Sequence, residues 1–174
     1  MLKELPQGSY NGINLTWEVI TQSPTLVDPY IFPLLLYLHE NYPQLQINAS
    51  CSGHNLQKLP FLSFQLKRDL FLYTYSFFFQ TLFLLQNFIE VDKNFHRMYF
   101  TEGKIQNYRI QFPSIKQYHT THAVFSAITI RCENTTHQDP LDTYHAFEQF
   151  IRRFLKRILQ SINEKKIDNR FFRF

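Results

Sequence analysis

Two histidines, His119 and His122, lie three residues apart in the segment QYHTTHAV, and such a pair could bind a metal ion or act in catalysis. Histidine binds metals and acts as a general acid or base near neutral pH. In an extended segment, however, residues i and i+3 point to opposite faces, so the two rings would converge on one ion only across a bulge. No acidic residue lies near them in the sequence. We therefore expect a surface role or a contact with phosphate or ribose.

A second polar cluster surrounds the predicted start of the last helix and consists of His137, Asp139, Asp142 and His145. Asp139 precedes Pro140, which is the pattern of an N-cap followed by proline in the first helical turn. Asp142 then lies in the first turn, where a negative charge complements the helix dipole. Capping accounts for both carboxylates, so the cluster does not indicate a metal site.

The motifs of common catalytic sites are missing from the sequence. The chain has four glycines among 174 residues and contains no GxGxxG, GxxxxGK[ST] or GxSxG motif. Its two cysteines, Cys51 and Cys132, form no Cys-x-x-Cys pair, which argues against zinc and against a disulfide framework. We expect neither an enzyme nor a bound cofactor or metal.

Basic residues carry the clearest signal. The net charge is +4, but residues 151–174 hold eight basic and two acidic residues, a local charge of +6. Clustered lysine and arginine suit a polyanionic partner such as RNA, although a solvated helix face is the simpler alternative. The basic face of the predicted helix consists of Arg152, Arg153, Lys156 and Arg157. Its other face carries apolar residues at steps of three and four from Phe147 to Ile162.

The sequence predicts that the first 58 residues form a separate α/β extension. This extension is slightly acidic, so we expect it to contact a neighbouring protein. It contains a predicted strand, a helix capped by Asp28 with Pro29 in its first turn, a second strand and a linker. Pro33 either interrupts this helix or sets a later start. These segments are, in order, Ile13–Thr21, the helix ended by Pro43, Leu45–Ser50 and Ser52–Lys58.

Residues 59–174 show a regular order of strand, helix, strand, strand, helix and a possible last strand. This α+β order is that of the ferredoxin-like split βαβ fold. The predicted elements are Phe61–Lys67, Leu70–Glu90, Lys104–Ile110, His122–Arg131, the helix after Asp139 and Ile167–Phe174. The uncharged stretch Leu70–Ile89 is long enough to span a bilayer, but its polar residues favour a buried amphipathic helix.

Several segments, taken in order, resemble the small-subunit ribosomal protein S-ten family, especially its mitochondrial branch. KIQNYRI resembles the strand that opens the family's long hairpin, the turn FPSIK follows, and Gln-Tyr and Thr-His complete the hairpin pattern. SFQLKRD resembles the family's first strand, and FEQFIRRFL its aromatic-rich last helix. The resemblance covers about residues 59–165. The hairpin tip PSIKQYHT is shorter and less basic than the family's.

The resemblance implies a structural constituent of a mitochondrial small ribosomal subunit, in its head, with rRNA and neighbouring ribosomal proteins as partners and no small-molecule substrate. It implies rRNA contacts along the hairpin, and the basic helix face adds the second set named above. The hairpin contacts carried over by position are Lys104, Arg109, Lys116, Thr121 and His122.

Two other classes of function remain open from the sequence. One is a free-standing regulatory module of the same fold that binds RNA or protein, as in transcription antitermination. The other is a membrane-associated subunit anchored by Leu70–Ile89, which the polar content of that segment disfavours.

Overall fold

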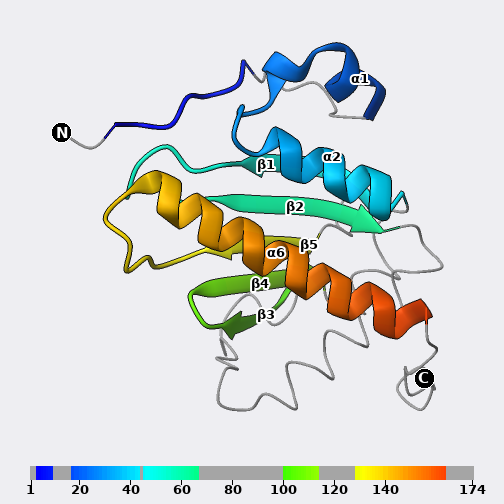
Figure 1. Ribbon diagram of the computed structural model, residues 1–174. Helices are drawn as coiled ribbons and strands as arrows, with labels where there is room; N and C mark the ends of the chain where they lie inside the picture. Colours follow the sequence, from blue (N-terminus) through cyan, green and yellow to red (C-terminus); the bar gives the residue numbers. More distant parts are fainter. Residues whose placement is uncertain (1–2, 10–16, 44, 67–99, 114–127, 164–174) are drawn as a thin grey trace.

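The protein is α+β, with helices packed on an antiparallel sheet (Figure 1). A computed structural model describes residues 3–9, 17–43, 45–66, 100–113 and 128–163. The helices are α1 (Trp17–Gln22), the short 3-10 helix η1 (Pro24–Leu26), α2 (Phe32–Asn41) and α6 (Pro140–Asn163). The strands are β1 (Leu45–Cys51), β2 (Phe61–Leu66), β3 (Phe100–Ile105), β4 (Tyr108–Pro113) and β5 (Ile128–Cys132).

The five described strands form one sheet in the order β1-β2-β5-β4-β3, and each neighbouring pair is antiparallel. β5 therefore lies between β2 and β4, which run in the same direction. Helices α2 and α6 both lie across one face of this sheet (Figure 1). The result is a two-layer structure in which the helices cover one side of the strands.

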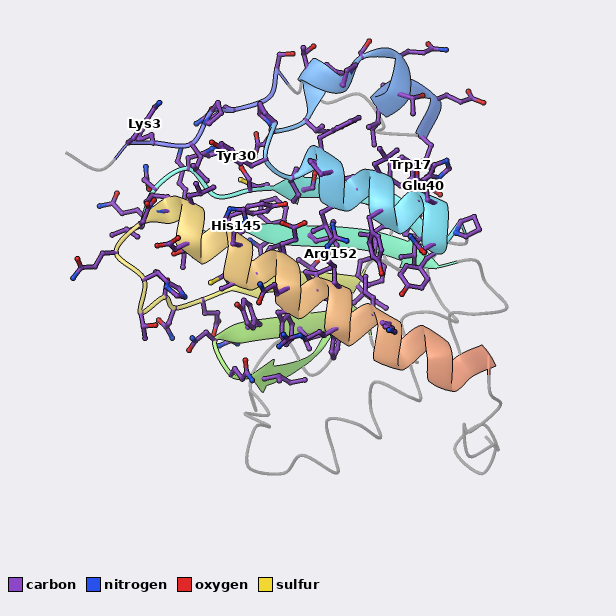
Figure 2. The ribbon with its side chains drawn as sticks, in the orientation of Figure 1. Lys3, Trp17, Tyr30, Glu40, His145 and Arg152 are labelled. Carbon is purple, nitrogen blue, oxygen red and sulfur yellow. The ribbon has the colours of Figure 1, made fainter. Side chains whose placement is uncertain are left out.

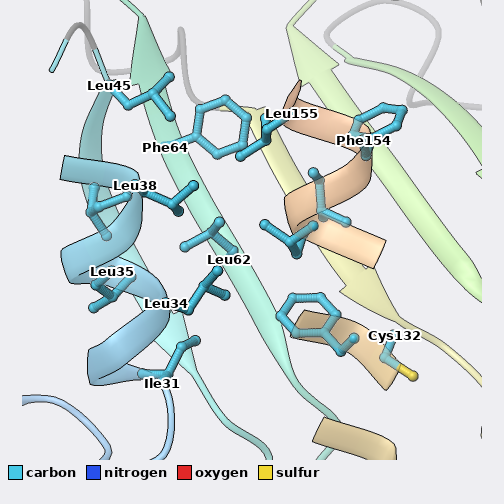
Figure 3. Packing of buried hydrophobic residues seen from close by; sticks show 14 of the residues in the cluster. Ile31, Leu34, Leu35, Leu38, Leu45, Leu62, Phe64, Cys132, Phe154 and Leu155 are labelled. Atoms are coloured by element: carbon cyan, nitrogen blue, oxygen red, sulfur yellow. The ribbon is translucent and has the colours of Figure 1, made fainter. Parts of the chain in front are cut away.

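Residues from both sides of the predicted boundary at residue 58 build one core. β1 is hydrogen-bonded to β2 from Leu45↔Leu66 to Cys51↔Phe61, so the predicted linker is the connection of a β-hairpin. Figure 3 shows side chains of α2, β2 and α6 meeting between the two layers. Buried members of this cluster include Leu34, Leu38, Leu62, Phe64 and Leu155.

The predicted strand Ile13–Thr21 is wrong where the structure describes it, because Trp17–Gln22 is the helix α1. The alternation of apolar and polar residues there suggested a strand, but the segment also places Trp17, Ile20 and Thr21 at helical spacing. Thr21 Oγ1 donates to the Trp17 carbonyl at 2.8 Å, a bond made along one helical turn. Ile20 is fully buried in the core.

The predicted strand Lys104–Ile110 is also wrong as one element, because a tight turn divides it. β3 and β4 form a hairpin in which Ile105 pairs with Tyr108 across the two turn residues Gln106 and Asn107. Gln106 has φ of 54°, the left-handed region that two-residue hairpins need. A Gln-Asn turn lacks the glycine that usually marks such hairpins, so the turn was not recognised from sequence.

Of the two starts that the sequence leaves open for α2, the later one, at Pro33, is confirmed, and the cap at Asp28 is wrong. The helix begins at Phe32 with Ile31 at the N-cap, and Pro33 rather than Pro29 occupies its first turn. The Asp28 carboxylate caps nothing there and instead accepts hydrogen bonds from the Gly8 N–H at 2.8 Å and the Ser52 N–H at 2.9 Å. One buried carboxylate therefore ties the N-terminal segment to the β1–β2 hairpin.

The last helix agrees with its prediction. Asp139 Oδ1 accepts a hydrogen bond from the Leu141 N–H at 2.9 Å, and α6 begins at Pro140. The apolar stripe faces the sheet: Phe147, Ile151 and Leu155 are buried. The strands predicted at Leu45–Ser50 and Phe61–Lys67 are confirmed as β1 and β2, apart from Lys67, which is not described.

Other predicted elements lie outside the described residues. These are the helix Leu70–Glu90, the tail Ile167–Phe174 and the first part of the strand His122–Arg131, of which β5 is the described end. Among the helices that are described, none combines the length and apolar character needed to cross a bilayer.

Phe147 offers a direct test of this packing. Phe147 lies on the side of α6 that faces the sheet and is fully buried. The centre of its ring is 6.0 Å from the centre of the Tyr108 ring on β4. Phe147→Ala should lower the free energy of unfolding by about 3–5 kcal/mol, because it removes buried apolar area and leaves a cavity. Urea denaturation followed by circular dichroism measures the change. Gln149→Ala, at an exposed position of the same helix, should change the midpoint little.

Candidate nucleic-acid interface

The face of the sheet that points away from the helices is polar. Along β2 and β5 the buried apolar residues alternate with polar ones, as expected for strands covered on one side only. Leu62, Phe64, Ile128 and Ile130 are fully buried toward the helices. The residues between them, on the opposite face, are Ser63, Gln65, Thr129 and Arg131. We call this opposite side the open sheet face.

A basic row crosses the open sheet face at right angles to the strands. In the sheet register, Phe61 on β2 is opposite Arg131 on β5, Arg131 is opposite Arg109 on β4, and Arg109 is opposite Lys104 on β3. Directly opposed residues share a face of the sheet. Arg109, Arg131 and Phe61 therefore lie on one line across three strands, and the backbone register continues this line to position 104 on β3.

The members of this row differ in what surrounds them. Arg131 is exposed, and its guanidinium carbon lies 5.0 Å from the centre of the Phe61 ring, a cation–π arrangement. Arg109 forms an ion pair with Glu133, and about a third of its side chain is exposed. Glu133 offsets the charge of Arg109, so Arg131 is the described cation of the row that is both exposed and stacked on an aromatic ring.

A second row of neutral hydrogen-bonding groups runs beside the first. Ser63 is opposite Thr129, and Thr129 is opposite Gln111. Thr129 Oγ1 donates to Ser63 Oγ at 3.1 Å. Hydroxyl and amide groups next to a guanidinium and an aromatic ring are the groups that contact phosphate, ribose and bases in RNA complexes.

The predicted basic face of α6 is only partly as expected. Arg152 does not point away from the fold: its guanidinium lies 4.1 Å from the centre of the Tyr37 ring of α2 and donates to Glu148 Oε1 at 2.9 Å. Figure 2 shows Arg152 where α6 faces α2. Arg153 and Lys156 are exposed on the outer side of the helix.

The other predicted contacts are placed as follows. Lys104 and Arg109 are brought together as a cross-strand pair in the β3–β4 hairpin. Arg157 belongs to α6, and its side chain is not among those described. Lys116, Thr121 and His122 lie outside the described residues. Of the cluster at the start of α6, Asp139 is the helix cap, as predicted, and His145 lies 3.8 Å from Glu148.

Sequence reasoning missed Arg131, Phe61 and Thr129 as members of this surface. The signal was present in the alternation of ITIRC, where Ile128, Ile130 and Cys132 occupy one face and the polar residues the other. The row itself could not be found, because it depends on the register of four strands that are distant in sequence.

Comparisons with known proteins do not assign the chain to a family: no family model, no curated protein and no solved structure matches it.

Arg131→Gln tests whether the open sheet face binds RNA. The substitution removes one exposed cation, so binding of an RNA oligonucleotide should weaken and the slope of log K against log salt should fall by about 1. Fluorescence anisotropy at several salt concentrations measures both. Arg153→Gln removes the same charge from the outer side of α6, and a smaller fall of the slope for this variant would show that the helix contributes less than the open sheet face. A slope that falls for Arg153→Gln alone would place the interface on the helix.

Proposed function

We propose that the chain is a non-enzymatic, RNA-contacting structural component of a mitochondrial small ribosomal subunit. The observation that carries the RNA contact is the basic row Phe61, Arg131, Arg109 and Lys104 on the open sheet face. The resemblance of residues 59–165 to the S-ten family supplies the assignment to the small subunit, the head and the mitochondrion.

The strand order supports a ferredoxin-like core. β2, β4 and β5 occupy the places of the first three strands of a split βαβ unit, and β5 lies between the other two, as that arrangement requires. The predicted strand Lys104–Ile110 is divided between β3 and β4. β1 pairs with the outer side of β2, where the fourth strand of such a fold would lie. β3 extends the other edge. Both edge strands are additions to the predicted core.

A layered fold of this kind divides contacts between its two sides. Among the described elements, the helices cover one face of the sheet and the polar rows lie on the other, where we place the RNA, while α6 carries Arg153 and Lys156 toward a second neighbour. A structural role fits this division, because the polar groups of the open sheet face are spread over several strands. Described residues of the N-terminal segment, around α1, suit a protein neighbour.

Co-sedimentation tests the proposal. A tagged chain, expressed in the organism that encodes it, should be recovered in the small-subunit fraction of a sucrose gradient of mitochondrial ribosomes. Quantitative mass spectrometry should give a one-to-one ratio of the chain to other small-subunit proteins. Arg131→Gln should release it at a lower salt concentration than the unaltered chain, because each lost phosphate contact lowers affinity.

The outcomes separate the parts of the proposal. Recovery in the large-subunit fraction would refute the subunit assignment while keeping a ribosomal role. A chain found at the top of the gradient, apart from both subunits, would refute the ribosomal role and favour a free-standing RNA- or protein-binding module.

A further inference from the structure

Asp28, Cys51 and His54 form a compact cluster at the start of the β1–β2 connection. Their side-chain ligand atoms all lie within 4.8 Å of one another. Among the described residues, these three side chains are the group of His, Cys, Asp or Glu that is close enough to hold a metal ion. No local sequence motif marks this cluster, because the cysteine belongs to a Cys-x-x-His pair and the carboxylate lies more than 20 residues earlier.

The backbone of the connection brings the pair together. Gly53 has φ of +76°, and a β-carbon at this position would lie 2.9 Å from the Pro60 ring, so the tight turn depends on glycine. The turn brings His54 back against Cys51, with 3.3 Å between Nε2 and Sγ. The Gly53 N–H also points at the Cys51 sulfur, 3.4 Å away.

Two pairs of ligand atoms in the cluster lie close to the separation of ligands around one ion, and the third pair lies within 4.8 Å. Cys51 Sγ is 3.3 Å from His54 Nε2, and His54 Nε2 is 3.8 Å from Asp28 Oδ2. Adjacent ligands of a tetrahedral zinc ion, at bond lengths of about 2.0–2.3 Å, are separated by about 3.3–3.6 Å. The second distance is too long for a hydrogen bond, so no strong direct contact joins the histidine to the carboxylate.

The ligand side chains are also buried, and hydrogen bonds orient the carboxylate. Asp28 and His54 are each 8% exposed. Asp28 is fixed by the Gly8 and Ser52 N–H groups, and the described polar contacts of the His54 side chain are made through Nε2, on the side of Cys51 and Asp28. The Asp28 carboxylate, already oriented by these donors, loses little freedom when an ion binds. The buried Nδ1 of His54 has no hydrogen-bond partner among the described residues.

The cluster opens to solvent on one side. A pocket of about 490 Å³ is lined by Cys51 and His54, and also by Arg131 and Phe61 of the basic row. Three protein ligands with an accessible fourth position are the pattern of a zinc site completed by water or another ligand. The pocket also has Lys58 on its wall, an exposed cation whose flexible side chain can remain in solvent.

A nucleophilic role for the cysteine fits less well. Burial, helped by the charge of Asp28, raises the pKa of the Cys51 thiol to about 11, so the thiol keeps its proton unless a bound cation displaces it. The histidine also presents the same nitrogen, Nε2, to the thiol and to the carboxylate, while a catalytic triad uses both ring nitrogens.

We propose that Asp28, Cys51 and His54 bind one divalent cation of the zinc class, with solvent from the pocket as the fourth ligand. Sulfur, imidazole and carboxylate together favour this borderline-soft ion over magnesium or calcium, which take oxygen ligands. The ion would join the N-terminal segment, through Asp28, to the β1–β2 hairpin at the edge of the open sheet face. This inference does not depend on the ribosomal proposal.

Titration of the full-length chain with zinc chloride tests the site. Isothermal titration calorimetry should give one ion per chain, and Co²⁺ should give the thiolate-to-metal charge-transfer absorption of a cysteine ligand. Cys51→Ser and His54→Gln should each weaken zinc binding by about 100-fold or more. Mutating a residue that only hydrogen-bonds to a metal ligand already lowers metal affinity by about 10–100-fold, and these substitutions remove the ligand itself.

Cys132→Ser is the matched control, since Cys132 lines the same pocket but lies outside the cluster. It should retain both the stoichiometry and the charge-transfer band. Asp28→Asn also removes a ligand, but Asp28 anchors Gly8 and Ser52, so Cys51→Ser, with circular dichroism to confirm folding, is the deciding variant. Failure to bind zinc stoichiometrically, or binding that survives Cys51→Ser, would overturn the proposal.

Discussion

The burial of two helices on one side of the sheet is the constraint on which the rest of the structure depends. α2 and α6 place their apolar stripes on the same face, so the strands must turn their buried residues toward that face throughout. Because side chains alternate along a strand, this choice also decides which residues lie on the opposite side. The polar character of the open sheet face is therefore a consequence of the core.

The strand β2 joins the two halves of the chain through this arrangement. It pairs with β1 on one side and with β5 on the other, and both of its fully buried residues, Leu62 and Phe64, contribute to the common core. Asp28 makes a second connection, since its buried carboxylate binds two backbone N–H groups far apart in sequence. Its position beside Cys51 and His54 brings a candidate metal site to the border of the candidate RNA surface.

Sequence patterns predicted the elements whose signals are local. The α+β class, the cap at Asp139, the apolar stripe of α6 and the strands β1 and β2 followed from periodicity and from capping chemistry. The turn at Gln106 and Asn107 was missed because it lacks glycine, and α1 was taken for a strand because a short segment satisfies both periods. The basic row and the Asp28 cluster depend on strand register and on contacts between distant segments, which no single-sequence pattern encodes. Arg152 fell on the predicted basic face, but Tyr37 and Glu148 hold it against the fold.

The central claim is that RNA lies against the open sheet face. Ultraviolet cross-linking of the chain to its bound RNA, followed by mass spectrometry of the cross-linked peptides, tests it most directly. The cross-links should map to β2 and β5, at Phe61 and around Arg131. Cross-links confined to the outer side of α6, around Arg153 and Lys156, would contradict it.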